Sequence, residues 1–150
     1  MTYFNLKAKA FIILLTAALF GSGAYAQAQT GGVVGAQTYA ENFFKAYKED
    51  TRKAVFELFK TNPRIDSGKL EDIVKTIDKE RKNIGDYHGK ELITQKKASG
   101  SLVLYSYLVK HDVQPVRFTF MFYKPKNDWI IYRFYFDGNV DSELQDSAKL

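Results

Sequence analysis

The spacing of apolar residues changes from a helical period to a strand period at Gly85, and this change constrains the fold more than any other feature. Before Gly85, apolar residues recur every three or four positions, as on one face of a helix. After it, apolar and polar residues alternate, as on the two faces of a strand. Helices that precede the strands, rather than alternate with them, predict an α+β domain.

Three helices are expected before this point, over residues 38–50, 51–63 and 67–85. Thr38 can cap the first helix, and Glu41 three residues later completes the pattern of a capping box. The apolar residues of each segment fall on one face, so we expect all three helices to pack against the sheet on that face.

Four strands are expected in the second half of the chain, and they form a curved antiparallel sheet with the helices on one face. The strands span residues 86–97, 101–110, 115–124 and 128–137. The polar residues 139–150 predict a tail that frays or forms a short turn.

The last two strands hold the densest group of aromatic residues in the chain. A register with Phe122 opposite Ile130 and Phe120 opposite Tyr132 makes one face wholly apolar, and this face is the expected core. A shift of one residue would bury Arg117 and Arg133 among the rings, so the alternation specifies the register strongly.

The opposite face of this hairpin carries residue types that are enriched in protein interfaces. They are Arg117, Trp129, Arg133 and Tyr135. An antiparallel sheet can leave one face open for a partner such as a second copy of the chain, and a simply solvated face is the alternative.

Two stretches resemble the NTF2-like superfamily, which has the cystatin-like fold. "QPVRFTFMFYKPKNDWIIYRFYFD" (114–137) resembles its last two strands, and "GDYHGKE" (85–91) resembles the entry into its first strand in exported members of unknown function. The resemblance covers residues 38–138. It implies a cone-shaped fold, a pocket between helices and sheet, and dimers formed through the sheet.

A surplus of aromatic residues on the first helix and the last two strands favours a small apolar ligand in that pocket. The candidate pocket residues are Phe43, Tyr47, Phe120, Tyr132 and Phe134. The strand positions that face the pocket include no carboxylate. This weakens the alternative implied by the resemblance, a pocket enzyme of the ketosteroid isomerase or polyketide cyclase type that uses one carboxylate base.

Other chemistry has little support in the sequence. There is no cysteine, and the two histidines lack the spacing of a zinc site, so we expect no metal or other cofactor. His111 is expected in a turn, as a solvated side chain. We therefore favour a binding domain without catalytic residues, and leave the enzyme open as the alternative.

The first 26 residues have the pattern of a signal peptide. Lys7 and Lys9 precede ten uncharged residues, and small residues lead to a cleavage site after Ala26. The apolar run is too short for a membrane span, so we expect a periplasmic or secreted protein without a stable membrane anchor. Residues 27–37 predict a flexible lead-in. Cleavage lowers the net charge of +5 by two, which argues against a nucleic-acid partner.

Overall fold

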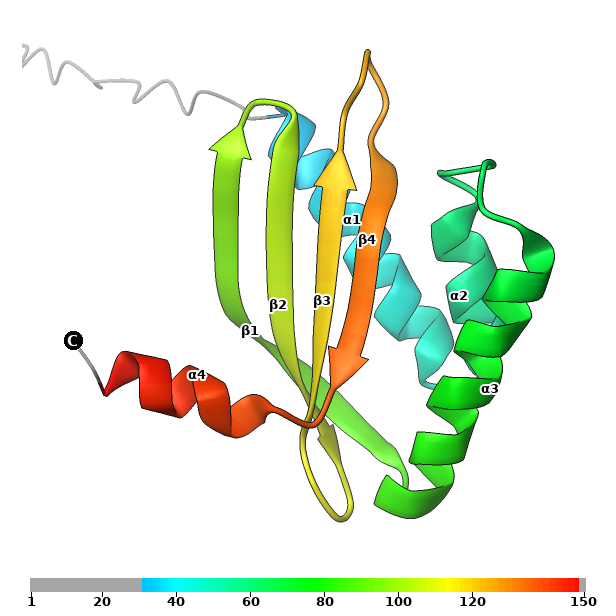
Figure 1. Cartoon of the computed structure of the whole chain (residues 1–150), viewed down its shortest axis with the longest axis vertical. Coiled ribbons are helices and arrows are strands. Elements are labelled where there is room, and N and C mark those ends of the chain that lie inside the picture. The colour runs from blue at the N-terminus through cyan, green and yellow to red at the C-terminus, as the bar shows by residue number, and fades with distance from the viewer. Residues whose placement is uncertain (1–30, 149–150) are drawn as a thin grey trace, which may run out of the picture.

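A computed structural model describes the backbone of residues 31–148. The signal peptide expected over residues 1–26 lies outside the described residues. Three helices precede a four-stranded antiparallel sheet with the strand order β1-β2-β3-β4, which confirms the expected α+β class (Figure 1). The elements are α1 (Gly31–Tyr47), α2 (Thr51–Phe59), α3 (Ser67–Ile84), β1 (Tyr87–Ser99), β2 (Leu102–His111), β3 (Val116–Tyr123), β4 (Ile130–Asp137) and α4 (Val140–Ser147).

The helix starts differ from the sequence expectation in one place. α1 begins at Gly31, so most of the expected lead-in is helical and Thr38 lies inside the helix instead of capping it. Aspartates cap the next two helices, as side-chain acceptors for free backbone N–H groups. Asp50 accepts from Lys53 N at 2.8 Å, before α2, and Asp66 accepts from Gly68 N at 2.8 Å, before α3.

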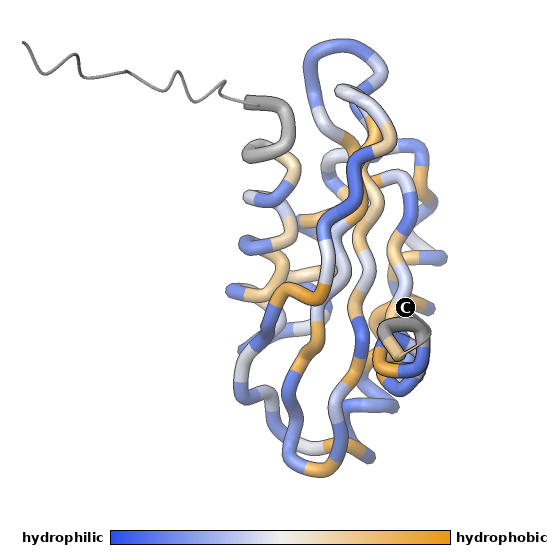
Figure 2. The backbone as a smooth tube through the Cα atoms, turned by 90° about the vertical axis from the view of Figure 1, so that its left-hand side faces the viewer, coloured by the Kyte–Doolittle hydropathy of each residue, from blue (hydrophilic) through white to orange (hydrophobic). Residues whose placement is uncertain are grey.

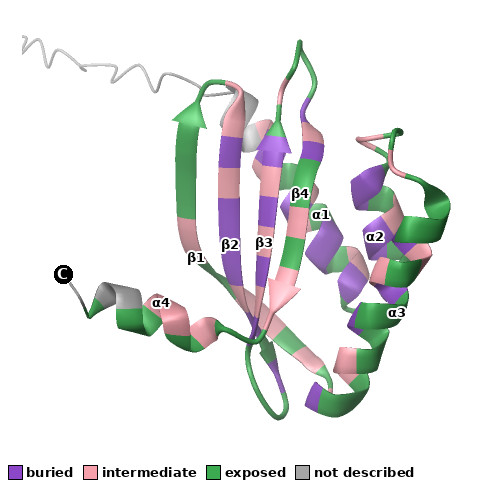
Figure 3. Ribbon diagram, viewed as in Figure 1, coloured by how far each residue is buried: buried purple, intermediate pink, exposed green. Residues whose placement is uncertain are grey.

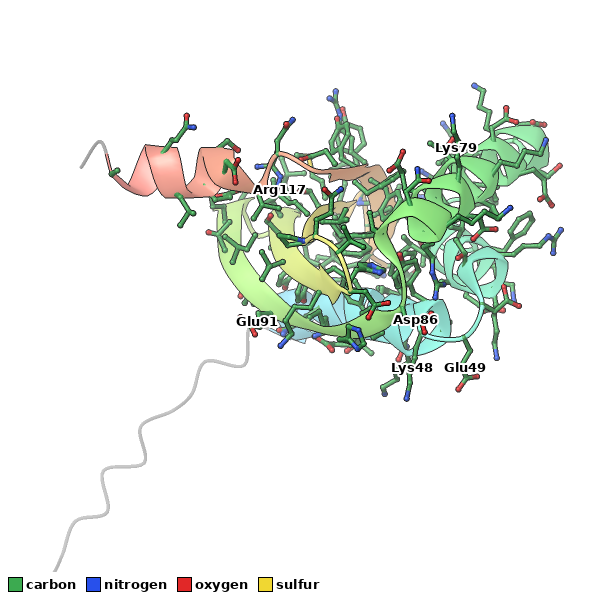
Figure 4. All side chains as sticks on the ribbon, turned by 90° about the horizontal axis from the view of Figure 1, so that it is seen from below. Lys48, Glu49, Lys79, Asp86, Glu91 and Arg117 are labelled. Carbon is green, nitrogen blue, oxygen red and sulfur yellow. The ribbon has the colours of Figure 1, made fainter. Side chains whose placement is uncertain are left out.

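The expected tail forms a fourth helix, α4, which lies on the opposite side of the sheet from α1 (Figure 2). Arg117 on β3 holds it there. Its guanidinium donates to Asp137 Oδ2 at 3.1 Å and to Glu143 Oε1 of α4 at 2.8 Å. Figure 4 shows Arg117 beside the start of α4, away from Lys48 and Glu49 at the end of α1.

The core lies between α1, α2 and the inner face of the sheet, and burial is concentrated there and in β2 and β3 (Figure 3). The rings of Phe43 and Phe44 from α1 meet Phe120 from β3 at centroid distances of 5.2 and 5.5 Å, close to edge-on. Edge-to-face contacts of this kind add to the free energy gained from burying the rings. The inner face is therefore the aromatic core that the alternation predicts.

The register of β3 against β4 differs from the predicted one because β4 contains a β-bulge. Met121 pairs with Arg133, but Phe122 pairs with Ile131, so Tyr132 is the extra residue of β4 at this point. An extra residue shifts the alternation of inward and outward side chains by one position. The prediction that Phe120 pairs with Tyr132 is therefore wrong, and Phe134 takes that place.

The bulge also exchanges side chains between the two faces. Tyr132, expected in the core, is 49% exposed, whereas Trp129, expected on the open face, is only 5% exposed. The loop after α2 fixes the bulged strand at its edge. Thr61 Oγ1 accepts from Ile131 N at 3.0 Å, and Asn62 Nδ2 donates to Ile131 O at 2.9 Å.

Candidate functional site

A cleft of about 400 Å³ lies between α3 and the inner face of the sheet, at the end of the sheet where β3 begins and β4 ends. It is open to solvent on one side. Its described lining combines the inner-facing residues of α3 with those of β3 and β4. The lining residues are Tyr47, Thr76, Ile77, Glu80, Ile84, Gln114, Val116, Phe118, Phe136, Asp137 and Gly138.

The cleft exists because α3 packs on α2 rather than on the sheet. α1 covers the middle of the inner face, and α2 lies between α1 and α3 (Figure 1). On the inner face, none of the described helices therefore packs directly over the end of the sheet near Val116 and Phe136, and a space remains between this end and α3. Phe136 is only partly buried there, although it lies on the core face.

The floor of the cleft is aromatic. Phe118 lies between Tyr47 and Phe136, at ring-centroid distances of 5.3 and 5.8 Å. Tyr47 and Phe118 are almost fully buried, so Phe136 is the ring of this group that is most accessible from the cleft. An apolar floor with a few polar groups at the rim is the usual composition of a small-molecule site.

Two carboxylates stand at the rim, and only one of them is paired with a cation. Asp137 pairs with Arg117 and also accepts from Asn139 N at 2.8 Å. Glu80, on α3, has no hydrogen bond or ion pair with any of the described residues. Thr76 and Gln114 are the exposed polar residues of the rim.

A buried polar group lies beneath the floor. His111 is 8% exposed, and its Nδ1 lies 2.9 Å from Gly85 O, which can only accept, so Nδ1 carries the proton. Nε2 is then the acceptor for the Tyr47 hydroxyl at 3.4 Å. Burial lowers the pKa of His111 and raises the pKa of Tyr47, which favours the neutral form of both. The expectation of a solvated His111 is therefore wrong.

The predicted pocket residues do not form one cavity. Tyr47 lines the cleft, whereas Phe120 and Phe134 belong to the packed core. Phe43 lines a second cavity of about 470 Å³ between α1 and α2, which has lysines and glutamates on its walls. Tyr132 lies on the outer surface. Of the five predicted residues, the cleft thus contains one.

Sequence reasoning missed the contribution of α3 to the cleft. Ile77, Glu80 and Ile84 lie three and four positions apart and so share one helical face. The available signal is a charged residue, Glu80, within an apolar stripe. Such a residue indicates that this part of the stripe faces a space that reaches solvent rather than a closed core.

A carboxylate beside a tyrosine hydroxyl, as the enzyme alternative requires, occurs once among the described residues, and it lies outside the cleft. Tyr107 Oη lies 3.4 Å from Glu41 Oε1, and Lys90 Nζ donates to the same oxygen at 2.7 Å. Burial raises the pKa of Tyr107, and the nearby Glu41 raises it further. This group joins α1 to β1 and β2 and lines none of the described cavities.

The predicted interface residues divide between two environments. Arg133 and Tyr135 are exposed on the outer face, and Arg133 Nη1 donates to the Tyr135 hydroxyl at 3.0 Å. This contact, together with one to the Tyr132 hydroxyl, raises the pKa of Arg133. Arg117 is occupied by α4, and Trp129 is buried, so the prediction that Trp129 lies on the open face is wrong.

No group of three or more metal-binding side chains occurs within the described part of the chain. His88 pairs with Asp112 near the end of α3, on the surface. None of the described helices has the length and apolar character of a membrane span.

No known family model matches this chain, and neither the curated proteins nor the solved structures contain a match to it.

Proposed function

We propose that this chain is an exported, non-enzymatic binding domain of the NTF2-like type, and that it holds a small apolar ligand in the cleft between α3 and the sheet. The observation that carries the proposal is the partly exposed Phe136 on an otherwise buried aromatic floor. Leaving such a ring accessible costs free energy that a ligand would recover by covering it. The signal-peptide pattern of residues 1–26 supports the export.

The order of the elements supports the NTF2-like assignment, because three helices precede a curved antiparallel sheet and lie on one side of it (Figure 1). The distribution of acidic groups supports binding rather than catalysis. The Glu41–Tyr107 pair is joined to Lys90 away from the cleft. Within the described lining, Glu80 and Tyr47 form no hydrogen bond with each other, and the Tyr47 hydroxyl faces His111.

A blocking substitution at the rim tests the proposal. Thr76 is exposed on α3 and lines the cleft, so Thr76→Phe should fill the entrance without changing the core. Lys79→Phe is the matched control, because Lys79 is exposed on the same helix and does not line the cleft (Figure 4). The probe is N-phenylnaphthylamine, a neutral molecule that fluoresces in apolar surroundings.

We expect the whole chain and the Lys79→Phe variant to bind the probe equally, and the Thr76→Phe variant to lose most of the binding. Equal binding by all three proteins would place the probe elsewhere and refute the cleft as the site. A wild-type chain that binds no probe would refute the proposal of an apolar site.

The outer face supports a separate proposal, contact with a second copy of the chain. Arg133 donates there to the hydroxyls of the exposed Tyr132 and Tyr135, and the exposed Tyr123 ring lies beside Tyr132. Exposed arginine and tyrosine side chains are enriched where proteins meet. The cleft opens on the inner side of the sheet, so ligand and partner would not compete.

A further inference from the structure

We infer that the ligand of the cleft carries a positively charged amine at one end of its apolar body. The inference rests on the proposed function and adds the chemical class of the ligand. It follows from the charges and rings that line the cleft, taken together.

The cleft has an unbalanced negative charge. The described residues of its lining include two carboxylates and no lysine or arginine. Asp137 is paired with Arg117, which leaves Glu80 as the unpaired charge among these described lining residues. No basic residue stands three or four positions from Glu80 along α3, so the helix itself supplies no partner.

An aromatic ring on the sheet side of the cleft can contact the same cation. Arg81 lies 4.6 Å from the centre of the Tyr47 ring and donates to Tyr47 O at 2.8 Å, so that ring already has a cationic neighbour. Phe136, on β4, has no such neighbour among the described residues and is the most accessible ring of the floor. An ammonium group between Glu80 and Phe136 would gain both an ion pair and a cation–π contact.

The same charges disfavour the other ligand classes. A carboxylate-bearing ligand of equal size would be placed beside Glu80 and Asp137 and repelled by like charge. A neutral ligand would cover Phe136 but leave Glu80 unpaired. Charge therefore ranks an amine first, a neutral compound second and an acid last.

Three compounds with one apolar body test this ranking: phenylbutylamine, phenylbutanol and phenylbutyrate. Their dissociation constants are measured with the whole chain by titration calorimetry. We expect the amine to bind roughly three- to tenfold more tightly than the alcohol, from a partly exposed ion pair and a cation–π contact. The acid should bind more weakly than the alcohol.

Two variants locate the charge that is responsible. Glu80→Gln should remove the preference for the amine, so that the dissociation constants of the amine and the alcohol become nearly equal. Asp78→Asn is the matched control, because Asp78 is an exposed acid on the same helix that does not line the cleft. It should keep the preference.

Other outcomes would refute either the amine inference or the proposed function. If amine and alcohol bind equally to the wild-type chain, or if Asp78→Asn removes the preference as fully as Glu80→Gln does, the amine inference is wrong and the proposed function stands. If none of the three compounds binds, the proposed function itself fails.

Discussion

The Tyr47 hydroxyl donates to His111 Nε2 across the base of the core, from α1 to the last residue of β2. The contact joins residues that are 64 positions apart. It places a neutral imidazole under the candidate site, with Arg81, Tyr87, His88 and Asp112 as its titratable and charged neighbours.

The burial of His111 makes the free energy of unfolding depend on pH in a defined direction. Because burial lowers the pKa of folded His111, the unfolded chain binds a proton that the folded chain does not, as pH falls below about 6.5. The free energy of unfolding should therefore fall as the pH is lowered from about 7 to about 5. The fall should be part of the roughly 1.4 kcal/mol per pH unit that one linked proton gives.

Urea unfolding at the two pH values measures this dependence. His111→Asn keeps a donor for Gly85 O and should remove most of the slope. His88→Gln removes the exposed histidine and should leave the His111 contribution in place. A slope that persists in the His111→Asn variant would show that other groups cause it.

Gly85 should tolerate no side chain. Its φ of 86° and ψ of −161° lie in a region that is nearly restricted to glycine, at a cost of roughly 1–3 kcal/mol for other residues. A Cβ there would also come within van der Waals overlap of the Asp112 carboxylate. Gly85→Ala should therefore lower the free energy of unfolding by at least this backbone cost, measured in urea.

The double variant Gly85→Ala/Asp112→Ala separates the two causes. It should recover only the part of the loss that comes from the overlap, because the backbone cost remains. Full recovery of the stability of Asp112→Ala would show that the backbone at Gly85 is not strained by alanine.

The bulge in β4 predicts an unusual tolerance to deletion. Without Tyr132, Ile131 still points inward, Arg133 outward and Phe134 inward, so the strand regains regular alternation. Deletion of Tyr132 should leave a folded protein with cooperative thermal unfolding. Deletion of Phe134 should abolish cooperative unfolding, because regular alternation would then turn Arg133 toward the core. Thermal unfolding of the two variants is followed by circular dichroism. Equally cooperative unfolding of both would contradict the assigned bulge.

Part of the fold could be predicted from the sequence alone. The change of period at Gly85 predicted the order of helices and strands correctly, because periodicity reflects which face of each element is buried. The alternation of β3 identified Phe118, Phe120 and Phe122 as core, and they are buried.

The candidate site was less predictable, for identifiable reasons. A bulge adds one residue without a signal in the composition, so the faces of Trp129 and Tyr132 were assigned the wrong way round. The cleft depends on where α3 lies relative to the sheet, and α3 contacts α2 instead. Periodicity reveals that a face is apolar but not which element covers it.

The outer face gives a prediction on assembly. If a second copy binds there, Arg133→Glu should lower the mass measured in solution by light scattering from that of a dimer to that of a monomer. Lys45→Glu makes the same charge change at an exposed site on α1 and should leave the dimer intact. A wild-type chain that is monomeric at high concentration would exclude this interface, and the cleft proposal would stand unchanged.

The place where a ligand binds decides whether the cleft between α3 and the sheet is the binding site. Methyl-labelled protein is titrated with phenylbutanol, and methyl shifts are followed by nuclear magnetic resonance. We expect the largest changes at Ile77, Ile84 and Val116, which line the cleft. Leu104 and Met121, on the outer face of the sheet, should stay unchanged. Changes centred on Leu104 and Met121, or no saturable change anywhere, would contradict this expectation.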